Sequence, residues 1–325
     1  MPIIVEFINE KKILSQDFEN NSKNSFKKIL NNKNLNKLSK LSKVDEGIIE
    51  KYVFEDVFEF DELPTDTVRL SASTIKQLFK DTNYNLDDVR KKKLVKPISL
   101  SLLPEEMKMI ENIKKRKELF IQIILPLVIK ENNYIRAERK KLFNILNKSH
   151  NTNSEKKWLE QKFKQYGVVN KDLSTLKVRM DEIPISMAIA QAAKETGWGT
   201  SRFAQEGNAL FGQWTWTGEG IKPAGAEVDS THKVMRFKVL QASVKAYHRN
   251  LNTHSSYRDF RRVRAELRDE GKALDSIVLS EHLDKYAQTG KKYIKILQQI
   301  IKQNKLTDFD DAKLLPSSIE LESLI

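Results

Sequence analysis

Apolar residues recur every three or four positions along a stretch in the first half of the chain. This spacing places them on one side of an α-helix and predicts a long helix between residues 105 and 146. The residues with this spacing are Met109, Ile113, Phe120, Ile124, Leu127, Ile135, Leu142 and Ile145. The most apolar part, Phe120–Ile129, is shorter than the roughly 20 residues of a membrane span, so we expect a buried helix. Pro126 lacks a backbone N–H and is expected to kink or split this helix.

A second helical pattern begins near Pro184 and ends near Gly197. Proline is favourable at the first position of a helix, and glycine commonly follows its last residue. The apolar positions that would form the buried face of this helix are Ile185, Ile189, Ala192 and Ala193. We therefore predict a short helix over residues 184–196.

Alternating residues predict two short strands after this helix. Trp214 and Trp216 are two positions apart, so both indoles fall on one face of a strand. Met235, Phe237 and Val239 alternate with basic residues and predict an opposing strand whose apolar side points inward. Because helical patterns dominate elsewhere, we predict a mainly α, α+β fold with a small β-hairpin lobe and a helical N-terminal extension.

Composition changes along the chain and predicts four segments. Three of the four Trp and ten of the 11 Gly fall between Gly167 and Gly290, which places a domain boundary near residue 166. Residues 51–60 are rich in Val and Phe and predict a strand or a short docking segment. The predicted segments are a disordered polar tail over 1–48, a helical extension over 49–166, a second domain over 167–306 and a loose acidic tail over 307–325.

The charge balance narrows the function only slightly. The net charge of +13 at pH 7 favours nucleic acid, an anionic membrane face or an acidic cell-wall polymer, but a composition rich in Asn, Lys and Ile produces the same excess. Basic runs scattered over the whole chain count against a nucleic-acid binder. Cysteine is absent, which excludes disulfides and thiolate chemistry. The five histidines lack His-Glu-x-x-His spacing, so we expect no metal and no cofactor and place His248 and His254 on helix surfaces.

Glu195 is the strongest candidate for chemistry, because it lies two residues before the predicted helix end. A carboxylate there faces the negative end of the helix dipole, and partial burial beside Trp198 and Phe211 would further disfavour its charged form. Both effects raise the pKa, as a general acid near neutral pH requires. The small residues Ala192 and Ala188, about one and two turns earlier, would let a ligand approach the helix. An ordinary exposed glutamate is the alternative.

Two motifs in this region resemble the glucosaminidase family of cell-wall hydrolases, glycoside hydrolase family 73, with its flagellar muramidase-like domains and autolysins. The motifs are AQAAKETGWG at residues 190–199 and NALFG at residues 208–212. Thr196 stands where the family usually has Ser, and Ala209 is inserted in the second motif. The segments at 124–142 and 250–268 resemble the Bax-like proteins of this family, so the resemblance covers about residues 50–306.

The resemblance implies roles for particular carboxyl groups. Glu195 matches the general acid that protonates the leaving glycosidic oxygen. A second carboxylate is expected in the β-hairpin lobe, where Glu227 lies nearest the matching position and Glu219 and Asp229 are the alternatives. Some glycosidases use the acetamido group of the substrate instead, so a missing second carboxylate would not exclude activity.

Aromatic and polar residues in the same region are candidates for binding sugar. Exposed rings can stack on the apolar faces of sugars, although core packing is the alternative role for each ring. Tyr286 resembles a tyrosine that lines the family's cleft near the acid, whereas Tyr293 is interpreted mainly as packing. The remaining substrate-binding candidates are Trp198, Asn208, Phe211, Trp214 and Trp216.

The implied function is hydrolysis of β-1,4 bonds after N-acetylglucosamine in peptidoglycan by a lysozyme-like catalytic domain over residues 167–306. Glycan strands would be the partner, with no nucleic acid and no membrane span. The family also carries labels for glycoprotein glycans and for an amidase, and these residues do not choose among the bonds. A non-catalytic wall-binding scaffold and a basic nucleic-acid binder are the rival hypotheses. The resemblance implies a periplasmic or cell-envelope location, although residues 1–12 show no export signal.

Overall fold

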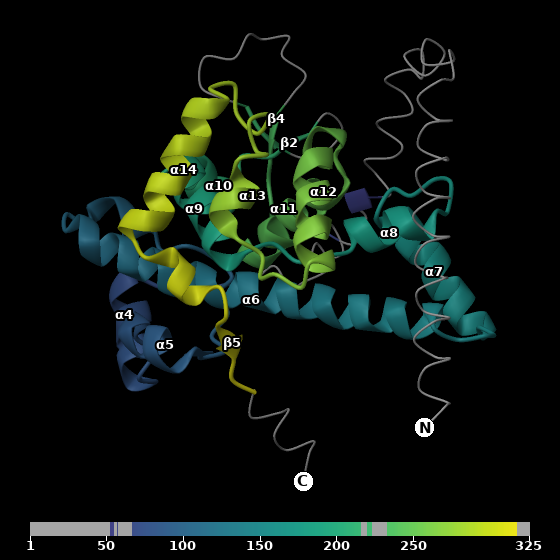
Figure 1. Ribbon diagram of the computed structural model, residues 1–325. Helices are drawn as coiled ribbons and strands as arrows, with labels where there is room; N and C mark the ends of the chain where they lie inside the picture. The colour runs from purple at the N-terminus through teal and green to yellow at the C-terminus, as the bar shows by residue number, and fades with distance from the viewer. Residues whose placement is uncertain (1–52, 55–56, 58–66, 216–219, 223–232, 317–325) are drawn as a thin grey trace. The chain divides into compact units, whose positions relative to one another are not determined.

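The computed structural model describes residues 53–54, 57, 67–215, 220–222 and 233–316 (Figure 1). The α-helices are α4 (Ala72–Asp81), α5 (Leu86–Lys92), α6 (Ile113–Leu146), α7 (Asn153–Gln165), α8 (Leu173–Arg179), α9 (Ile185–Thr196), α10 (Arg202–Gly207), α11 (Leu240–Thr253), α12 (Arg258–Asp269), α13 (Ser276–Ser280) and α14 (Lys291–Gln303). The 3-10 helices are η2 (Glu105–Met109), η3 (Ser255–Tyr257) and η4 (Leu306–Phe309). The strands are β1 (Leu94–Val95), β2 (Trp214–Thr215), β3 (Gly220–Ile221), β4 (Lys233–Met235) and β5 (Lys313–Leu314). The predicted mainly α, α+β fold is confirmed, and the predicted tail over 1–48 lies outside the described residues.

Helix α9 lies inside the main hydrophobic core and carries Glu195 in its last turn. Every residue from Ile185 to Ala193 is buried, and α6, α13, α14 and η4 pack against the helix. A helix buried on all sides needs apolar residues on all its faces, which the sequence ISMAIAQAA supplies except at Ser186 and Gln191. Pro184 is the N-cap rather than the first helical residue, so the helix begins one residue later than predicted, at Ile185.

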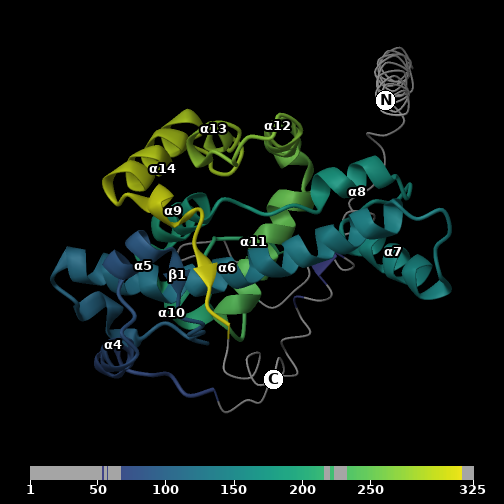
Figure 2. The ribbon, with the colours of Figure 1, turned by 60° about the horizontal axis from the view of Figure 1, so that its bottom comes forward.

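Helix α6 runs without interruption past its proline. Both Figure 1 and Figure 2 show it as a single helix, so of the two predicted effects of Pro126, a split is wrong and a kink stays a prediction. The residues Leu119–Ile129 are buried apart from Gln122, which confirms the predicted buried helix. Because α9 and α11 pack against α6, burial of this segment outweighs the cost of about 3 kcal/mol for one interior proline.

The strands form two small sheets. In the first, the order is β2-β4-β3 with antiparallel pairing, and Trp214 lies opposite Val234. The second pairs β1 with β5 in parallel. The predicted opposing strand extended too far, because the chain leaves the sheet after β4 and buries Phe237 and Val239 in a cluster with Val57. Val57, from the segment predicted as a strand or a docking segment, is helical and therefore matches only the docking alternative.

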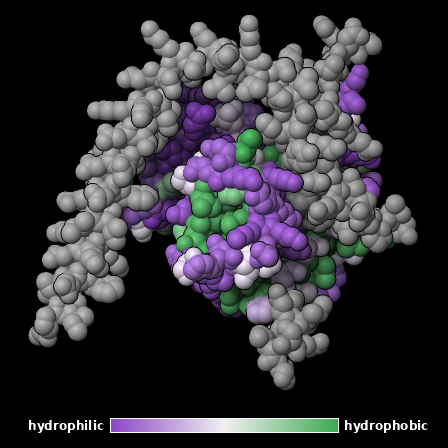
Figure 3. All heavy atoms as spheres, turned by 90° about the vertical axis from the view of Figure 1, so that its right-hand side faces the viewer, coloured by the Kyte–Doolittle hydropathy of each residue, from purple (hydrophilic) through white to green (hydrophobic). Residues whose placement is uncertain are grey.

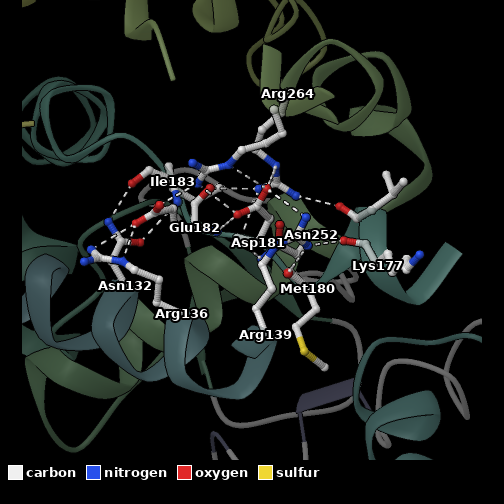
Figure 4. Close-up of polar contacts among 12 residues, drawn as sticks. Asn132, Arg136, Arg139, Lys177, Met180, Asp181, Glu182, Ile183, Asn252 and Arg264 are labelled. Atoms are coloured by element: carbon white, nitrogen blue, oxygen red, sulfur yellow. Dashed lines mark hydrogen bonds and ion pairs between the residues drawn. The ribbon is translucent and has the colours of Figure 1, made fainter. Parts of the chain in front are cut away.

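The loop that enters α9 is fastened to α6 by Asn132 (Figure 4). The Asn132 amide Nδ2 donates to the Ile183 carbonyl at 2.7 Å, and the Ile183 N–H donates to Asn132 Oδ1 at 3.1 Å. This pair of hydrogen bonds copies the pairing of two backbone peptides, so it fixes both the position and the orientation of the loop. The start of the helix that carries Glu195 is therefore set by α6.

Asp181, in the same loop, is buried among arginines from two helices (Figure 4). Arg139 comes from α6, and Arg264 and Arg268 come from α12. Burial by itself would raise the pKa of Asp181, but the three guanidinium groups outweigh burial and hold the pKa below its usual value. The ion pairs join α6 and α12 through the loop before α9.

Residues 306–316, which follow α14, include η4 and β5, and Asp310 among them caps α9. Phe309 is buried, and Asp310 accepts hydrogen bonds from the Ser186 N–H and the Ser186 hydroxyl, both at 2.7 Å. These hydrogen bonds give the Ser186 N–H, in the first turn of α9, an acceptor that the N-cap residue Pro184 cannot supply. The structure of residues 307–316 thus differs from the predicted loose tail, because η4 and β5 both find partners in the fold.

The surface turned to the viewer in Figure 3 is mixed in character, with hydrophilic side chains around a smaller apolar area. Within the described ranges, no helix is both long enough and apolar enough to cross a membrane.

Candidate functional site

The chain turns sharply after α9, at a helix end predicted from the sequence. Gly197 follows the last helical residue with a left-handed conformation, φ 56°, which glycine adopts without a steric penalty. The Thr196 hydroxyl donates to the Ala192 carbonyl at 2.6 Å and accepts from the Gly199 N–H at 2.9 Å. Threonine keeps the hydroxyl of the serine usual at this motif position, so the substitution preserves the turn.

Glu195 is half-buried in the last turn of α9. Burial raises the pKa of Glu195, while a hydrogen bond from Tyr293 and the charge of Lys194 act in the opposite direction. The pKa of Glu195 is raised overall, which is the direction predicted from the sequence. A carboxyl group with a raised pKa keeps its proton closer to neutral pH, which suits proton donation.

Three tyrosines interact electrostatically with Glu195: Tyr257 from η3, Tyr286 from the loop before α14 and Tyr293 from α14. Tyr247 from α11 interacts with these three, and we call the four residues the tyrosine cluster. The Tyr286 and Tyr293 rings are stacked with their centroids 5.5 Å apart, and Tyr257 lies 5.9 Å from Tyr286. Burial raises the pKa of all four hydroxyls, so they remain uncharged donors and acceptors near neutral pH.

Within the tyrosine cluster, Tyr293 is the tyrosine whose hydroxyl acts to lower the pKa of Glu195, against the larger effect of burial. The sequence interpretation assigned Tyr293 mainly to packing and Tyr286 to the cleft. The Tyr286 hydroxyl instead donates to the Phe211 carbonyl at 2.8 Å, and its ring supports Tyr293 by stacking. The sequence could not show how the two hydroxyls are placed relative to the carboxyl group.

The NALFG motif brings a glycine against Glu195. A Cβ built on Gly212 would lie 3.2 Å from Glu195 Oε2, and Gly212 has φ 61°. At the start of the motif, the Asn208 side chain donates to the carbonyls of Phe237 and Lys238 at 2.9 and 3.1 Å. The motif therefore ties the chain after α10 to the chain after β4 and places its glycine over the carboxyl group.

Two of the predicted sugar-binding rings pack within the protein. Phe211 is buried and stacks on Tyr247, with ring centroids 3.9 Å apart. Trp198 is half-buried, meets Phe120 edge to face at 5.8 Å and lies beneath the Lys117 ammonium group at 4.9 Å. In this arrangement Phe211 offers a backbone carbonyl to the site, and Trp198 anchors the turn after α9 to α6.

The structure describes only part of the β-hairpin lobe. Trp214 lies in β2, opposite Val234, and nothing further is described for its side chain. The other predicted site residues of the lobe lie outside the described residues: Trp216, Glu219, Glu227 and Asp229. Their roles stay predictions.

Gln191 belongs to the site, although no role was predicted for it from the sequence. It is fully buried and hydrogen-bonded to both Tyr247 and Tyr293. Its signal in the sequence was a lone amide in an apolar helix, one turn before Glu195, because a buried amide requires partners. The prediction that Ala188 and Ala192 admit a ligand was wrong, since both are fully covered by protein.

His248 is also placed differently from the prediction. It is fully buried rather than on a helix surface, with Nε2 3.0 Å from Asn132 Oδ1 and Nδ1 2.9 Å from the Val244 carbonyl oxygen. Burial lowers the pKa of His248 to about 4, so the imidazole is neutral at neutral pH. In the part of the chain that the structure describes, no group of three or more His, Asp or Glu side chains is arranged to hold a metal ion.

Comparison with known proteins identifies the family. The profile described as mannosyl-glycoprotein endo-beta-N-acetylglucosaminidase, the glucosaminidase family, matches residues 171–306. Protein bax of Escherichia coli (strain K12) is 32% identical over 195 residues, which cover 58% of this chain and 70% of that protein. This chain belongs to the Bax-like proteins with a glucosaminidase domain. No solved structure matches the chain significantly.

Membership of the Bax-like proteins confirms the resemblance drawn from the two motifs. The matched profile covers Glu195, Gly212 and the tyrosine cluster. The glucosaminidase domain is of the glycosidase type, and glycans are its substrate class. The mainly α fold with small sheets is consistent with a lysozyme-like assignment for this family.

Proposed function

We propose that this Bax-like protein hydrolyses peptidoglycan at the β-1,4 bond after N-acetylglucosamine, with Glu195 as the general acid. The observation that carries the proposal is the half-buried Glu195 carboxyl group, whose pKa burial raises, at the end of α9 in the matched domain. Such a group retains the proton that the leaving glycosidic oxygen must receive.

In the proposed reaction, the Glu195 proton passes to the glycosidic oxygen as the bond to the anomeric carbon breaks. Positive charge then develops on the sugar ring. Tyr286 and the rest of the tyrosine cluster offer uncharged, electron-rich rings beside this charge. The sugar face would stack on Trp214 and Trp216 of the β-hairpin lobe.

Water or a nucleophile completes the hydrolysis from the opposite side of the ring. We assign this work to Glu227, with Glu219 and Asp229 as alternatives in the same lobe. The acetamido group of the substrate is a further alternative, and it would need no second carboxylate. If a lobe carboxylate does act, its distance from Glu195 predicts whether the configuration at the anomeric carbon is retained or inverted.

Digestion of purified peptidoglycan, followed by mass spectrometry of the new ends, tests the proposal. A new reducing end at N-acetylglucosamine is expected. Glu195→Gln should lower the rate by about 10²-fold or more, since general acid catalysis contributes roughly 10²–10⁴-fold. Glu206→Gln, which changes an exposed glutamate on α10, is the matched control and should retain the wild-type rate.

Other products would replace the proposal with a defined alternative. A new free amine would indicate an amidase, and release of glycan from a glycoprotein only would indicate a different glycan substrate. Sedimentation with peptidoglycan without any cleavage would indicate a wall-binding scaffold. Wild-type activity in Glu195→Gln would remove Glu195 from the mechanism.

A second set of variants tests the assignment in the β-hairpin lobe. Glu227→Gln should lower turnover while sugar binding survives, and by less than Glu195→Gln if the acetamido group of the substrate shares the work. Glu219→Gln and Asp229→Asn are the controls. Assays of all three on peptidoglycan check the ranking, and a larger loss in either control would contradict the choice of Glu227.

A cell-envelope location follows from the proposed substrate, which lies outside the cytoplasm. We expect peptidoglycan strands to be the partner and no specific binding of nucleic acid. Cell fractionation with an antibody against the chain checks the location.

A further inference from the structure

A cavity of about 560 Å³ opens on a part of the molecule that the proposed reaction does not use. Its walls come from the loop before α4, from η2, from α10, from β3 and from the chain just after β4. We call it the basic cavity, after the three cationic side chains that line it: Arg69, Lys108 and Arg236. Neither Glu195 nor the tyrosine cluster lines it, so it is separate from the candidate site.

Arg69 and Gln205 form a fixed wall of the basic cavity. The Arg69 guanidinium group donates to Gln205 Oε1 at 3.2 Å and to the Gln205 carbonyl at 2.8 Å. Gln205 is buried, and its Nε2 donates in turn to the carbonyls of Pro104 and Gly199 at 3.1 and 2.7 Å. A charged group that is held in this way loses little freedom when it receives a ligand, so this wall is preorganised.

Arg236 is seated on α10. A Cβ built on Gly207 would lie 3.6 Å from Arg236 Cγ and 2.7 Å from Ile221 Cδ1, so both side chains lie against the glycine backbone. The Phe237 N–H donates to the Gly207 carbonyl at 2.8 Å and holds the chain that carries Arg236. The aliphatic part of Arg236 is therefore supported, and its guanidinium group is left for the cavity.

The charges that line the basic cavity leave a positive excess. Glu105 and Glu206 also line it, but Glu105 lies 3.6 Å from Arg69, and Glu206 lies 3.9 Å from Arg202.

Lys108 and Arg236, by contrast, are exposed and have no hydrogen-bond or ion-pair partner for their side chains among the described residues. An anion in the cavity would supply the missing partner.

We propose that the basic cavity is a carboxylate subsite, which receives a free carboxylate of a peptidoglycan peptide stem while the glycan strand lies at Glu195. The proposal rests on the proposed function. N-acetylglucosamine is uncharged, so the carboxylates of the peptide stems supply the negative charge of this substrate. The planar guanidinium groups of Arg69 and Arg236 match the two oxygens of a carboxylate, and Lys108 adds a further charge.

The basic cavity lies within reach of a stem whose glycan strand occupies the site at Glu195. Its wall at Gln205 is bonded to Gly199, which follows Glu195 by four residues. The backbones of Glu195 and Gly199 are therefore at most about 14 Å apart. A stem of four residues extends over about the same distance, so one substrate molecule can span both sites.

Titration with a synthetic stem peptide tests the subsite without any cleavage. The probe is N-acetyl-L-Ala-γ-D-Glu-L-Lys-D-Ala, and its fully amidated form, which has no free carboxylate, is the control ligand. Binding to the full chain is followed by NMR chemical shifts of nitrogen-15-labelled protein. We expect saturable binding of the acid form, and binding of the amidated form that is weaker by roughly tenfold or more.

Variants of the two unpartnered cations locate the binding. Lys108→Gln and Arg236→Gln should each weaken binding of the acid form roughly tenfold, because each removes a charge that faces the carboxylate. Lys76→Gln is the matched control, since Lys76 is exposed on α4 and does not line the cavity. All three variants replace exposed side chains, so their melting temperatures should match the wild type.

A comparison of two substrates links the subsite to catalysis. One is intact peptidoglycan, and the other is glycan strands from which an amidase has removed the stems. Arg236→Gln should raise KM roughly tenfold on the intact substrate and leave kcat unchanged, because the contact is made equally in the ground state and the transition state. Its rate on the stripped strands should equal that of the wild type.

Defined outcomes would overturn the proposal. These are equal binding of the acid and amidated peptides, or unchanged affinity in both Lys108→Gln and Arg236→Gln. Displacement of the peptide by an equimolar amount of inorganic phosphate would also overturn it, because the cavity would then prefer phosphate. If the chain binds the stem peptide but cleaves no glycan, the proposed function fails and the subsite stands. If it cleaves glycan but does not bind the peptide, only the subsite fails.

Discussion

The missing side chain of Gly212 shapes the site as much as the tyrosines beside Glu195 do. The backbone at Gly212 approaches the carboxyl group so closely that an added Cβ would lie 3.2 Å from Oε2. Its left-handed conformation, φ 61°, is also one that residues with a Cβ seldom adopt. The close approach to Glu195 and the left-handed conformation together explain why glycine stands at the end of the NALFG motif.

We expect Gly212→Ala to lower turnover roughly tenfold, because the new methyl group displaces the Glu195 carboxyl group from its position. Strain in the left-handed conformation adds a cost in folding free energy of about 1 kcal/mol. Gly271→Ala is the control, since Gly271 has φ 68° but nothing within 4 Å of an added Cβ. Rates and melting temperatures of both variants separate contact from strain. Equal rates in the two variants would show that the contact with Glu195 is unimportant.

At the scale of elements, the hydrogen-bond donors in the first turn of α9 find their acceptor in a distant segment of the chain. Pro184 has no side-chain hydrogen bond to offer, so the first turn is capped by Asp310, which lies more than a hundred residues later in the sequence. Burial, together with the charges of Asp311 and Asp275, raises the pKa of Asp310 to about 6, against the hydrogen bonds from Ser186. The segment after α14 is thus part of the support of the site.

The raised pKa of Asp310 predicts a pH dependence of stability. An aspartate in the unfolded chain has a pKa of about 3.9, so between pH 4 and about 6 the folded state alone binds this proton. This contribution to stability is full below pH 4 and is lost as the pH rises through 6. Asp310→Asn cannot titrate and should reduce the fall in unfolding free energy across this range by about 1–2 kcal/mol.

Urea unfolding at pH 4.5 and pH 7 measures this effect. Asp87→Asn is the control, because the Asp87 side chain is exposed, pairs with Arg90 at the surface and is not among the groups that act on Asp310. The pH dependence of that variant should match the wild type. If Asp310→Asn keeps the full wild-type dependence, another group is responsible for it.

At the scale of the whole molecule, the helical extension and the glucosaminidase domain share one hydrophobic core. Helix α6 contributes Phe120, Ile124 and Leu127 to the core that contains α9. It also holds the loop before α9 through Asn132 and Arg139. Each fully buried aliphatic side chain contributes about 1.5–3 kcal/mol, so these contacts are a large fraction of a typical folding free energy. The division of the chain near residue 166 stays a prediction.

Truncation tests how the parts depend on one another. A chain that starts at residue 49 should keep the melting temperature and activity of the full chain, because the polar composition of residues 1–48 predicts little burial. A fragment of residues 167–325 should aggregate, since it lacks α6 and exposes α9. Size-exclusion chromatography and thermal melts check both. A soluble, cooperatively folded 167–325 fragment would contradict the dependence on α6.

Several features of this protein could be predicted because their signals are local. Apolar spacing identified the buried segment of α6, although α6 begins only at Ile113 and Met109 and Ile113 are exposed, and Gly197 identified the end of α9. The two motifs led to the family and to Glu195, and a carboxyl group near a helix end already implied the direction of its pKa shift. In each case neighbouring residues carry the whole signal.

Tertiary structure decided which side chains meet at Glu195. No local rule distinguishes Tyr293 from Tyr286, reveals that Gln191 joins Tyr247 to Tyr293, or predicts that Asp310 caps α9. These contacts depend on how separate helices pack, and packing responds to the volume and hydrogen-bonding needs of the whole core. The same reason explains why Pro126 did not split α6 and why His248 is buried. The sequence determined the chemical group, and the fold determined the surroundings that set its proton.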